Sequence, residues 1–200
     1  NQITSFQIGA MGHSHKNKVS DAKDISIGIV APDGKEGMLS HAEQFADTGI
    51  PFFFDPGQNV PIIEKDELLT AFEHATWLTF NDYEWQLVED KTGLTIDTIN
   101  DHVEALIVTK GGEGSIIYTK GKQYEIPSAK AKELADPTGC GDAFRAGLLY
   151  GLMNDMDWET TGRIASLIGA VKIEKAGTQN HNFSKQEFAD RFKENFGYSF

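Results

Sequence analysis

The 200-residue sequence is poor in cysteine, in positive charge and in long apolar runs. Cys140 is the only cysteine, so an intrachain disulfide and a metal cage built from cysteines are excluded. The 18 basic and 30 acidic residues give a net charge of −12, which argues against general attraction to nucleic acid or an anionic membrane. Apolar stretches such as residues 146–153 are much shorter than a membrane span of roughly 20 residues. We therefore expect neither nucleic acid nor a membrane as a partner, and a reducing, cytoplasmic setting.

The N-terminus also lacks a methionine, a basic leader and an apolar signal core. It starts at Asn1 and indicates a chain entered partway. What is present is an ordinary globular composition, with 40% hydrophobic and 24% charged residues, which is enough apolar material for a sizeable core.

Strand-like and helix-like segments alternate along most of the chain. Short β-branched or aromatic runs predict strands at residues 25–30, 51–54, 77–80 and 105–109, and apolar residues at helical spacing predict helices at 38–46, 65–74 and 82–91. A hairpin is expected from 115–119 and 123–126, followed by helices at 141–154, 157–175 and 184–195. This alternation predicts an α/β fold with a mainly parallel sheet, in which ligands bind beyond the carboxyl ends of the strands.

The most informative motif is DPTGCGDAFRAG at residues 136–147. Gly139 and Gly141 flank Cys140 just before a predicted helix, where backbone N–H groups and the helix dipole favour a bound anion. Asp142 adds a carboxylate acceptor beside these donors, a combination that suits phosphoryl transfer to a hydroxyl group. The alternative is a type I turn followed by an N-capping aspartate. For Cys140, a nucleophilic thiol and a small packing residue are both open, and we expect packing.

This motif resembles the C-terminal signature of the ribokinase-like sugar and nucleoside kinases, the PfkB family. Three further motifs, described below, stand in the family's order along the chain, so the resemblance covers it from about residue 24 onward. The resemblance implies that Asp142 is the catalytic base and that Gly139, Cys140 and Gly141 form the anion hole for the transferred phosphate. It also implies a three-layer α/β/α fold with a mainly parallel central sheet, from which the N-terminal strands and most of the β lid are absent. Residues 1–23 would be a remnant of the lid and N-terminal substrate region, and 24–200 the C-terminal nucleotide-binding and catalytic part of a single kinase domain.

The second motif pairs Asn81 with Glu84 at the end of a predicted strand. By itself it is a near match to a helix capping box. The family's Asn-x-x-Glu motif falls at this place and is tied to metal and phosphate. The resemblance therefore implies that Asn81 contacts the nucleotide and that Glu84 holds Mg²⁺ through water, in keeping with the water ligands that Mg²⁺ usually retains.

The third motif, TKGGEG at residues 109–114, is a strand end followed by a glycine-rich loop. It does not match a Walker A loop, and a tight β-turn would explain it equally well. In ribokinase-like enzymes the equivalent loop contacts ATP, which implies nucleotide-binding roles for Thr109, Lys110, Gly111, Gly112, Glu113 and Gly114. Ser166 matches a further nucleotide-contact position.

The fourth motif, GTQNH at residues 177–181, follows the predicted helix 157–175, and a C-capping glycine explains it locally. In many family members this loop helps to hold a monovalent cation, K⁺, together with the aspartate and threonine of the signature. The resemblance therefore implies a cation site made of Asp136 and Thr138, of backbone oxygens near Lys172, Lys175 and Gly177, and of His181, which stands where a small polar residue is common.

Together these motifs imply an ATP- and Mg²⁺-dependent kinase that acts on a primary hydroxyl of a small-molecule nucleoside or sugar. Residues 1–6, 9–11 and 177–181 are most similar to bacterial adenosine-kinase-like members, which points to the adenosine 5′-hydroxyl, AMP as product and a role in purine salvage. The alternatives are a ribokinase- or fructokinase-type sugar kinase and a nucleotide-binding fragment without turnover. The resemblance also implies a homodimer formed through the lid.

Overall fold

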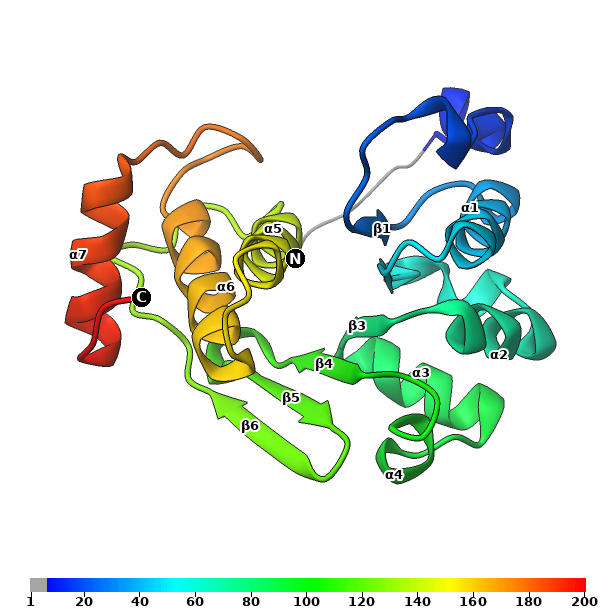
Figure 1. Cartoon of the computed structure of the whole chain (residues 1–200). Coiled ribbons are helices and arrows are strands. Elements are labelled where there is room, and N and C mark those ends of the chain that lie inside the picture. The colour runs from blue at the N-terminus through cyan, green and yellow to red at the C-terminus, as the bar shows by residue number, and fades with distance from the viewer. Residues whose placement is uncertain (1–6) are drawn as a thin grey trace. The chain divides into compact units, whose positions relative to one another are not determined.

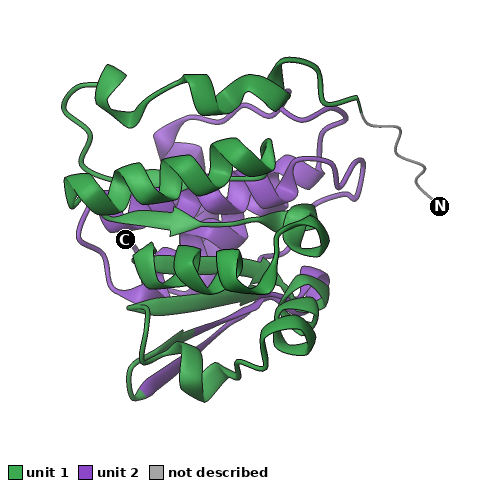
Figure 2. Cartoon of the chain, turned by 90° about the vertical axis from the view of Figure 1, so that its right-hand side faces the viewer, with its two compact units in different colours: residues 1–108, 118–121 green, residues 109–117, 122–200 purple. Residues whose placement is uncertain are grey.

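The computed structural model describes residues 7–200 of the chain (Figure 1). The chain divides into two compact units, which Figure 2 colours separately. The first contains Asn1–Val108 and Tyr118–Gly121, and the second contains Thr109–Ile117 and Lys122–Phe200. The sequence predicted a division between residues 23 and 24 instead, within the first unit, and that assignment stays a prediction.

Strands and helices alternate along the first unit, as the apolar pattern predicted. Its first three strands pair in parallel, with Ile29 opposite Phe53 and Phe53 opposite Trp77. The elements, in chain order, are η1 (Gly9–Lys16), η2 (Val19–Asp21), β1 (Gly28–Val30), α1 (Lys35–Thr48), β2 (Phe52–Phe54), η3 (Gly57–Ile62), α2 (Lys65–His74), β3 (Trp77–Asn81), α3 (Asp82–Thr92), α4 (Ile96–Ile99) and β4 (Ala105–Thr109), whose last residue belongs to the second unit.

Strand β2 shows why an uninterrupted aromatic run forms a strand. Phe52, Phe53 and Phe54 are each at most 1% exposed, so both faces of the strand are covered. Phe54 meets the ring of Phe72 from α2 edge to face, with ring centroids 6.1 Å apart. The core of this unit therefore lies between the parallel strands and their crossover helices.

The rest of the chain forms a hairpin and a set of helices, again as predicted, and all of it belongs to the second unit except Tyr118–Gly121, the end of β5 and the hairpin turn. Its elements are η4 (Gly111–Glu113), β5 (Ser115–Thr119), β6 (Lys122–Ile126), α5 (Cys140–Met153), α6 (Trp158–Ile173) and α7 (Lys185–Phe196). All six strands belong to one sheet in the order β1-β2-β3-β4-β5-β6, which gives the mixed α/β architecture that the sequence indicated.

Close contact between α5 and α6 depends on small residues. A Cβ atom at Gly147 would lie 2.5 Å from the Cα of Ala165, so no side chain fits there without moving one helix. This contact fixes the start of α5, which carries the signature motif, against α6. Among the helices of residues 7–200, none has the length and apolar character that a membrane crossing requires.

Candidate active site

Asp136 ties together the loop before α5 and the loop after α6. Its carboxylate accepts hydrogen bonds from the backbone N–H of Thr138, at 2.9 Å, and of Gly177, at 2.8 Å. These two bonds, with the Thr138 hydroxyl and the nearby charge of Lys172, lower the pKa of Asp136 to about 2. The structure therefore brings together two of the motifs that lie about 40 residues apart in the sequence.

Gly139 is the N-cap of α5 and adopts the left-handed conformation, with φ of +86°. A Cβ atom here would lie 3.2 Å from the Cβ of Thr178. The loop that follows α6 therefore approaches the backbone at Gly139 closely. The N–H of Cys140 donates to the carbonyl of Pro137 at 3.1 Å, so one of the three predicted anion-hole donors is used within the turn. The N–H of Gly141 lies in the first turn of α5, where helix geometry provides no intrahelical acceptor.

Asp142 lies in the first turn of α5, and its side chain is 74% exposed. One carboxylate oxygen accepts a hydrogen bond from the guanidinium of Arg145, one helical turn later, at 2.6 Å. Asp142 thus belongs to the same first turn as the N-terminal N–H groups of the helix. A proton acceptor next to an anion-binding helix end is the arrangement that transfer of a phosphoryl group to a hydroxyl requires.

Cys140 is a packing residue in this structure. Burial raises the pKa of its thiol, and the sulfur lies 3.8 Å from the carbonyl oxygen of Gly169 on α6. A raised pKa keeps the thiol protonated near neutral pH, which argues against a nucleophilic role.

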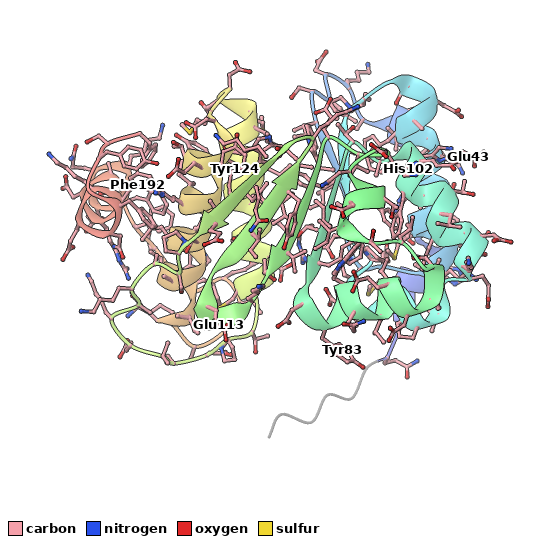
Figure 3. All side chains as sticks on the ribbon, turned by 90° about the horizontal axis from the view of Figure 1, so that it is seen from below. Glu43, Tyr83, His102, Glu113, Tyr124 and Phe192 are labelled. Carbon is pink, nitrogen blue, oxygen red and sulfur yellow. The ribbon has the colours of Figure 1, made fainter. Side chains whose placement is uncertain are left out.

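The glycine-rich loop after β4 closes on itself. The N–H of Lys110 donates to Gly114 at 2.8 Å, and the N–H of Glu113 donates back to Lys110 at 3.1 Å. An ideal Cβ at Gly111 or at Gly112 would have no atom within 4 Å, so this backbone faces open space. Figure 3 labels Glu113 at the tip of the loop. The exposed backbone is available to a flat ligand such as a nucleotide base, although contact with ATP stays a prediction.

Ser166 on α6 has a structural partner on each side of its hydroxyl. It donates to the carbonyl of Pro127 at 2.9 Å and accepts from the N–H of Ala129 at 2.8 Å. It thereby fixes the segment that follows β6, and its predicted nucleotide contact is not tested by these bonds.

Asn81 and Glu84 form the capping box that was the alternative reading of their motif. The Asn81 side chain accepts from the N–H of Glu84 at 2.7 Å, and the Glu84 carboxylate accepts from the N–H of Asn81 at 2.9 Å. Tyr83 between them is 69% exposed. Figure 3 labels this residue. Residues 7–200 contain no cluster of three or more His, Cys, Asp or Glu side chains that would form a metal cage. One carboxylate still fits Mg²⁺, because this ion keeps several waters and uses few protein ligands.

The predicted cation site holds a feature that the sequence reasoning missed. Lys172 was expected to contribute a backbone oxygen, but its own ammonium group lies 2.7 Å from the carbonyl oxygen of Asp136 and 3.3 Å from that of Lys175. The Lys172 residue is 0% exposed. A lysine within the apolar run of α6 was the available signal. His181 stacks on the ring of Phe183, with centroids 6.3 Å apart.

Comparison with known proteins identifies relatives along the whole chain. A family model described as pfkB family carbohydrate kinase matches residues 13–185. A nucleoside kinase of Methanocaldococcus jannaschii is 35% identical over 90% of this chain and 59% of its own length. A crystal structure of Methanocaldococcus jannaschii nucleoside kinase superposes with a TM-score of 0.91 at 34% identity. The match covers 97% of this chain and 64% of that chain. An adenosine kinase of Saccharomyces cerevisiae is 26% identical over 82% of this chain and 53% of its own length.

A Burkholderia thailandensis nucleoside kinase in complex with ADP-inosine is 48% identical, with a TM-score of 0.97 over 100% of this chain and 62% of that chain. The chain thus spans about six-tenths of the length of these two nucleoside kinases. The signature geometry around Asp136, Gly139 and Asp142 and the match over residues 13–185 lead to one conclusion. The chain belongs to the pfkB family of carbohydrate kinases.

Proposed function

We propose that this chain is the nucleotide-binding and catalytic part of a kinase that transfers the γ-phosphoryl group of ATP to the 5′-hydroxyl of a nucleoside, with adenosine as the first substrate to test and AMP as its product. The observation that carries the proposal is the placement of Asp142 in the first turn of α5, beside N–H groups that have no intrahelical acceptor. The similarity to nucleoside kinases, one of them in complex with ADP-inosine, supports a nucleoside acceptor. The role would be purine salvage in the cytoplasm, where ATP is supplied and Cys140 stays reduced.

The chemistry that this site supports is a direct transfer. The acceptor oxygen forms a bond to the γ-phosphorus while the bond from that phosphorus to the ADP oxygen breaks, and the hydroxyl proton passes to the Asp142 carboxylate. The Gly141 N–H and the start of α5 stabilise negative charge on the transferred group. Mg²⁺, held through water at Glu84, would neutralise charge on the phosphates when bound. The glycine-rich loop 109–114 and Ser166 would contact the nucleotide.

The test has a binding arm and a turnover arm. Calorimetry measures MgADP binding, and an ADP-release assay compares adenosine, inosine, ribose and fructose as acceptors. We expect turnover with the nucleosides and not with the free sugars. Turnover with ribose or fructose alone would indicate a sugar kinase, and MgADP binding without turnover would indicate a nucleotide-binding fragment.

The variant Asp142→Asn tests the assigned base. Loss of general-base catalysis should lower kcat by about 10²- to 10⁴-fold while MgADP binding stays close to that of the wild type. Asp155→Asn is the matched control, because Asp155 is an exposed aspartate just beyond the other end of α5. Equal activity of Asp142→Asn and wild type would remove Asp142 from the mechanism.

A further inference from the structure

Lys172 is a fully buried cation that makes no salt bridge with a carboxylate among residues 7–200. The residue is 0% exposed, and its ammonium group donates to two backbone carbonyls, those of Asp136 and Lys175. A buried ammonium is costly unless its donors are satisfied, so a lysine at such a position needs a specific role.

The carboxylates around Lys172 are engaged elsewhere. The carboxylate of Asp136 accepts from the N–H groups of Thr138 and Gly177. Glu174 is paired with Arg191 on α7, and Glu133 lies 3.8 Å from the ammonium of Lys175. The ammonium is also close enough to lower the pKa of Asp136 and to oppose the rise in the pKa of Cys140. Its charge therefore acts on the loop that carries the proposed anion hole.

Backbone hydrogen bonds to a different carbonyl also hold this loop to the end of α6. The N–H groups of Ala135 and Asp136 both donate to the carbonyl of Ile173, at 2.9 and 3.0 Å. Lys172 lies in the last turn of α6, where the helix dipole favours a positive charge. The segment 135–136 is thus bonded to the C-terminus of α6 in both directions. Its N–H groups donate to Ile173, and its Asp136 carbonyl accepts from the Lys172 ammonium.

We propose that the Lys172 ammonium is a built-in monovalent cation, which takes the place of an exchangeable K⁺ and positions the loop 136–139 for phosphate binding. It is a positioning residue, since it contacts the backbone of the loop. The proposal rests on the proposed function for its catalytic consequence, but its structural part is independent of the substrate. It is an alternative to the exchangeable cation that the family resemblance implies at Asp136, Thr138, Lys172, Lys175, Gly177 and His181.

The first experiment needs no variant. Thermal unfolding, MgADP binding and nucleoside turnover of the wild-type protein are compared in KCl, NaCl and choline chloride at equal ionic strength. A built-in cation predicts the same values in all three salts. A selective increase of stability, of nucleotide affinity or of kcat in KCl would overturn the proposal.

The second experiment removes the ammonium. Lys172→Ala should weaken MgADP binding in choline chloride by about tenfold or more, the effect of losing a charge-assisted hydrogen bond, and KCl or ammonium chloride should restore binding by entering the space left behind. Lys172→Met fills that space without a charge, and its MgADP binding should be weaker than that of the wild type in every salt. Lys193→Met is the matched control, since Lys193 is an exposed lysine on α7 with no part in this loop, and it should behave as wild type.

Wild-type nucleotide binding by a folded Lys172→Ala in choline chloride would contradict the proposal. If the alanine variant does not fold, the comparison of salts on the wild type still decides. An absence of turnover with every acceptor would count against the proposed function only, because the unfolding and MgADP measurements report on Lys172 without it.

Discussion

Gly139 is the residue at which backbone conformation and function meet most directly. Its φ of +86° is one that other residues adopt at a cost of about 1 kcal/mol or more, and a Cβ here would lie 3.2 Å from Thr178. Gly139→Ala should therefore destabilise the protein and also displace the loops that form the phosphate site. We expect a weaker MgADP affinity and a lower kcat, measured by calorimetry and by ADP release.

Gly197 provides the control for this prediction. Its φ is +82°, nearly that of Gly139, but a Cβ there would have no atom within 4 Å. Gly197→Ala should show a comparable loss of thermal stability with unchanged nucleotide binding. Equal binding by both variants would mean that the close contact with Thr178 has no role in the site.

The sequence predicted some of these residues and not others for a physical reason. Asn81 and Glu84 are three apart, so local spacing alone predicted their capping box. The bond from Lys172 to Asp136 joins residues 36 positions apart, and no local pattern encodes it. The expected anion hole also counted the N–H of Cys140 as a free donor, whereas in the structure this group donates to the carbonyl of Pro137.

Helix α7 is attached to the rest of its unit by a buried ion pair. The guanidinium of Arg191 bonds both carboxylate oxygens of Glu174, and it also donates to the carbonyl of Lys130 at 3.0 Å. The Arg191 and Glu174 side chains are 12% and 9% exposed. Burial tends to raise the pKa of Glu174, but Arg191 and the N–H of Lys132 outweigh it, so the pKa lies below its ordinary value.

Arg191→Met should destabilise the protein by about 3 kcal/mol at neutral pH, because it leaves a buried carboxylate without its charge partner. In the wild type, the stability contributed by Glu174 is present above its unfolded-state pKa and is lost as the pH falls through the lowered folded-state value. In the variant, burial without Arg191 raises that pKa, so protonation relieves the penalty. The stability difference should narrow as the pH falls toward about 4.

Denaturant unfolding at several pH values measures this difference. Lys193→Met is the matched control, an exposed basic residue on the same helix, and should change stability little at any pH. A pH-independent difference between Arg191→Met and wild type would show that lost packing, and not charge, is responsible.

Element prediction succeeded where apolar periodicity was strong. The strand Phe52–Phe54 and the helices α5, α6 and α7 all lie where the pattern placed them, within a few residues at their ends. The 3-10 segments η1 and η3 were missed, since short turns of this kind carry no apolar period. Most of the proposed site consists of segments that connect periodic elements, which is why its motifs, and not its periodicity, revealed it.

At the scale of the whole molecule, the net charge of −12 and the local phosphate site make opposite demands on a polyphosphate ligand. Long-range repulsion discourages any extended polyanion, whereas N–H donors and a helix dipole act only on a group seated at the start of α5. Binding should therefore depend on fit to the site and not on the number of phosphates offered. A comparison of duplex DNA with MgADP at equal phosphate concentration distinguishes binding by fit to the site from binding by the number of phosphates.

We expect MgADP at about 100 times its Kd to stabilise the protein by about 2.7 kcal/mol, through binding to the folded state alone. For a chain of this size that corresponds to a rise in Tm of roughly 5–10 °C. Duplex DNA at low salt should leave Tm unchanged, because binding to it would need a basic surface that a chain with 30 acidic and 18 basic residues does not favour. A DNA-induced rise that disappears on adding salt would instead reveal a basic patch strong enough to overcome the overall charge.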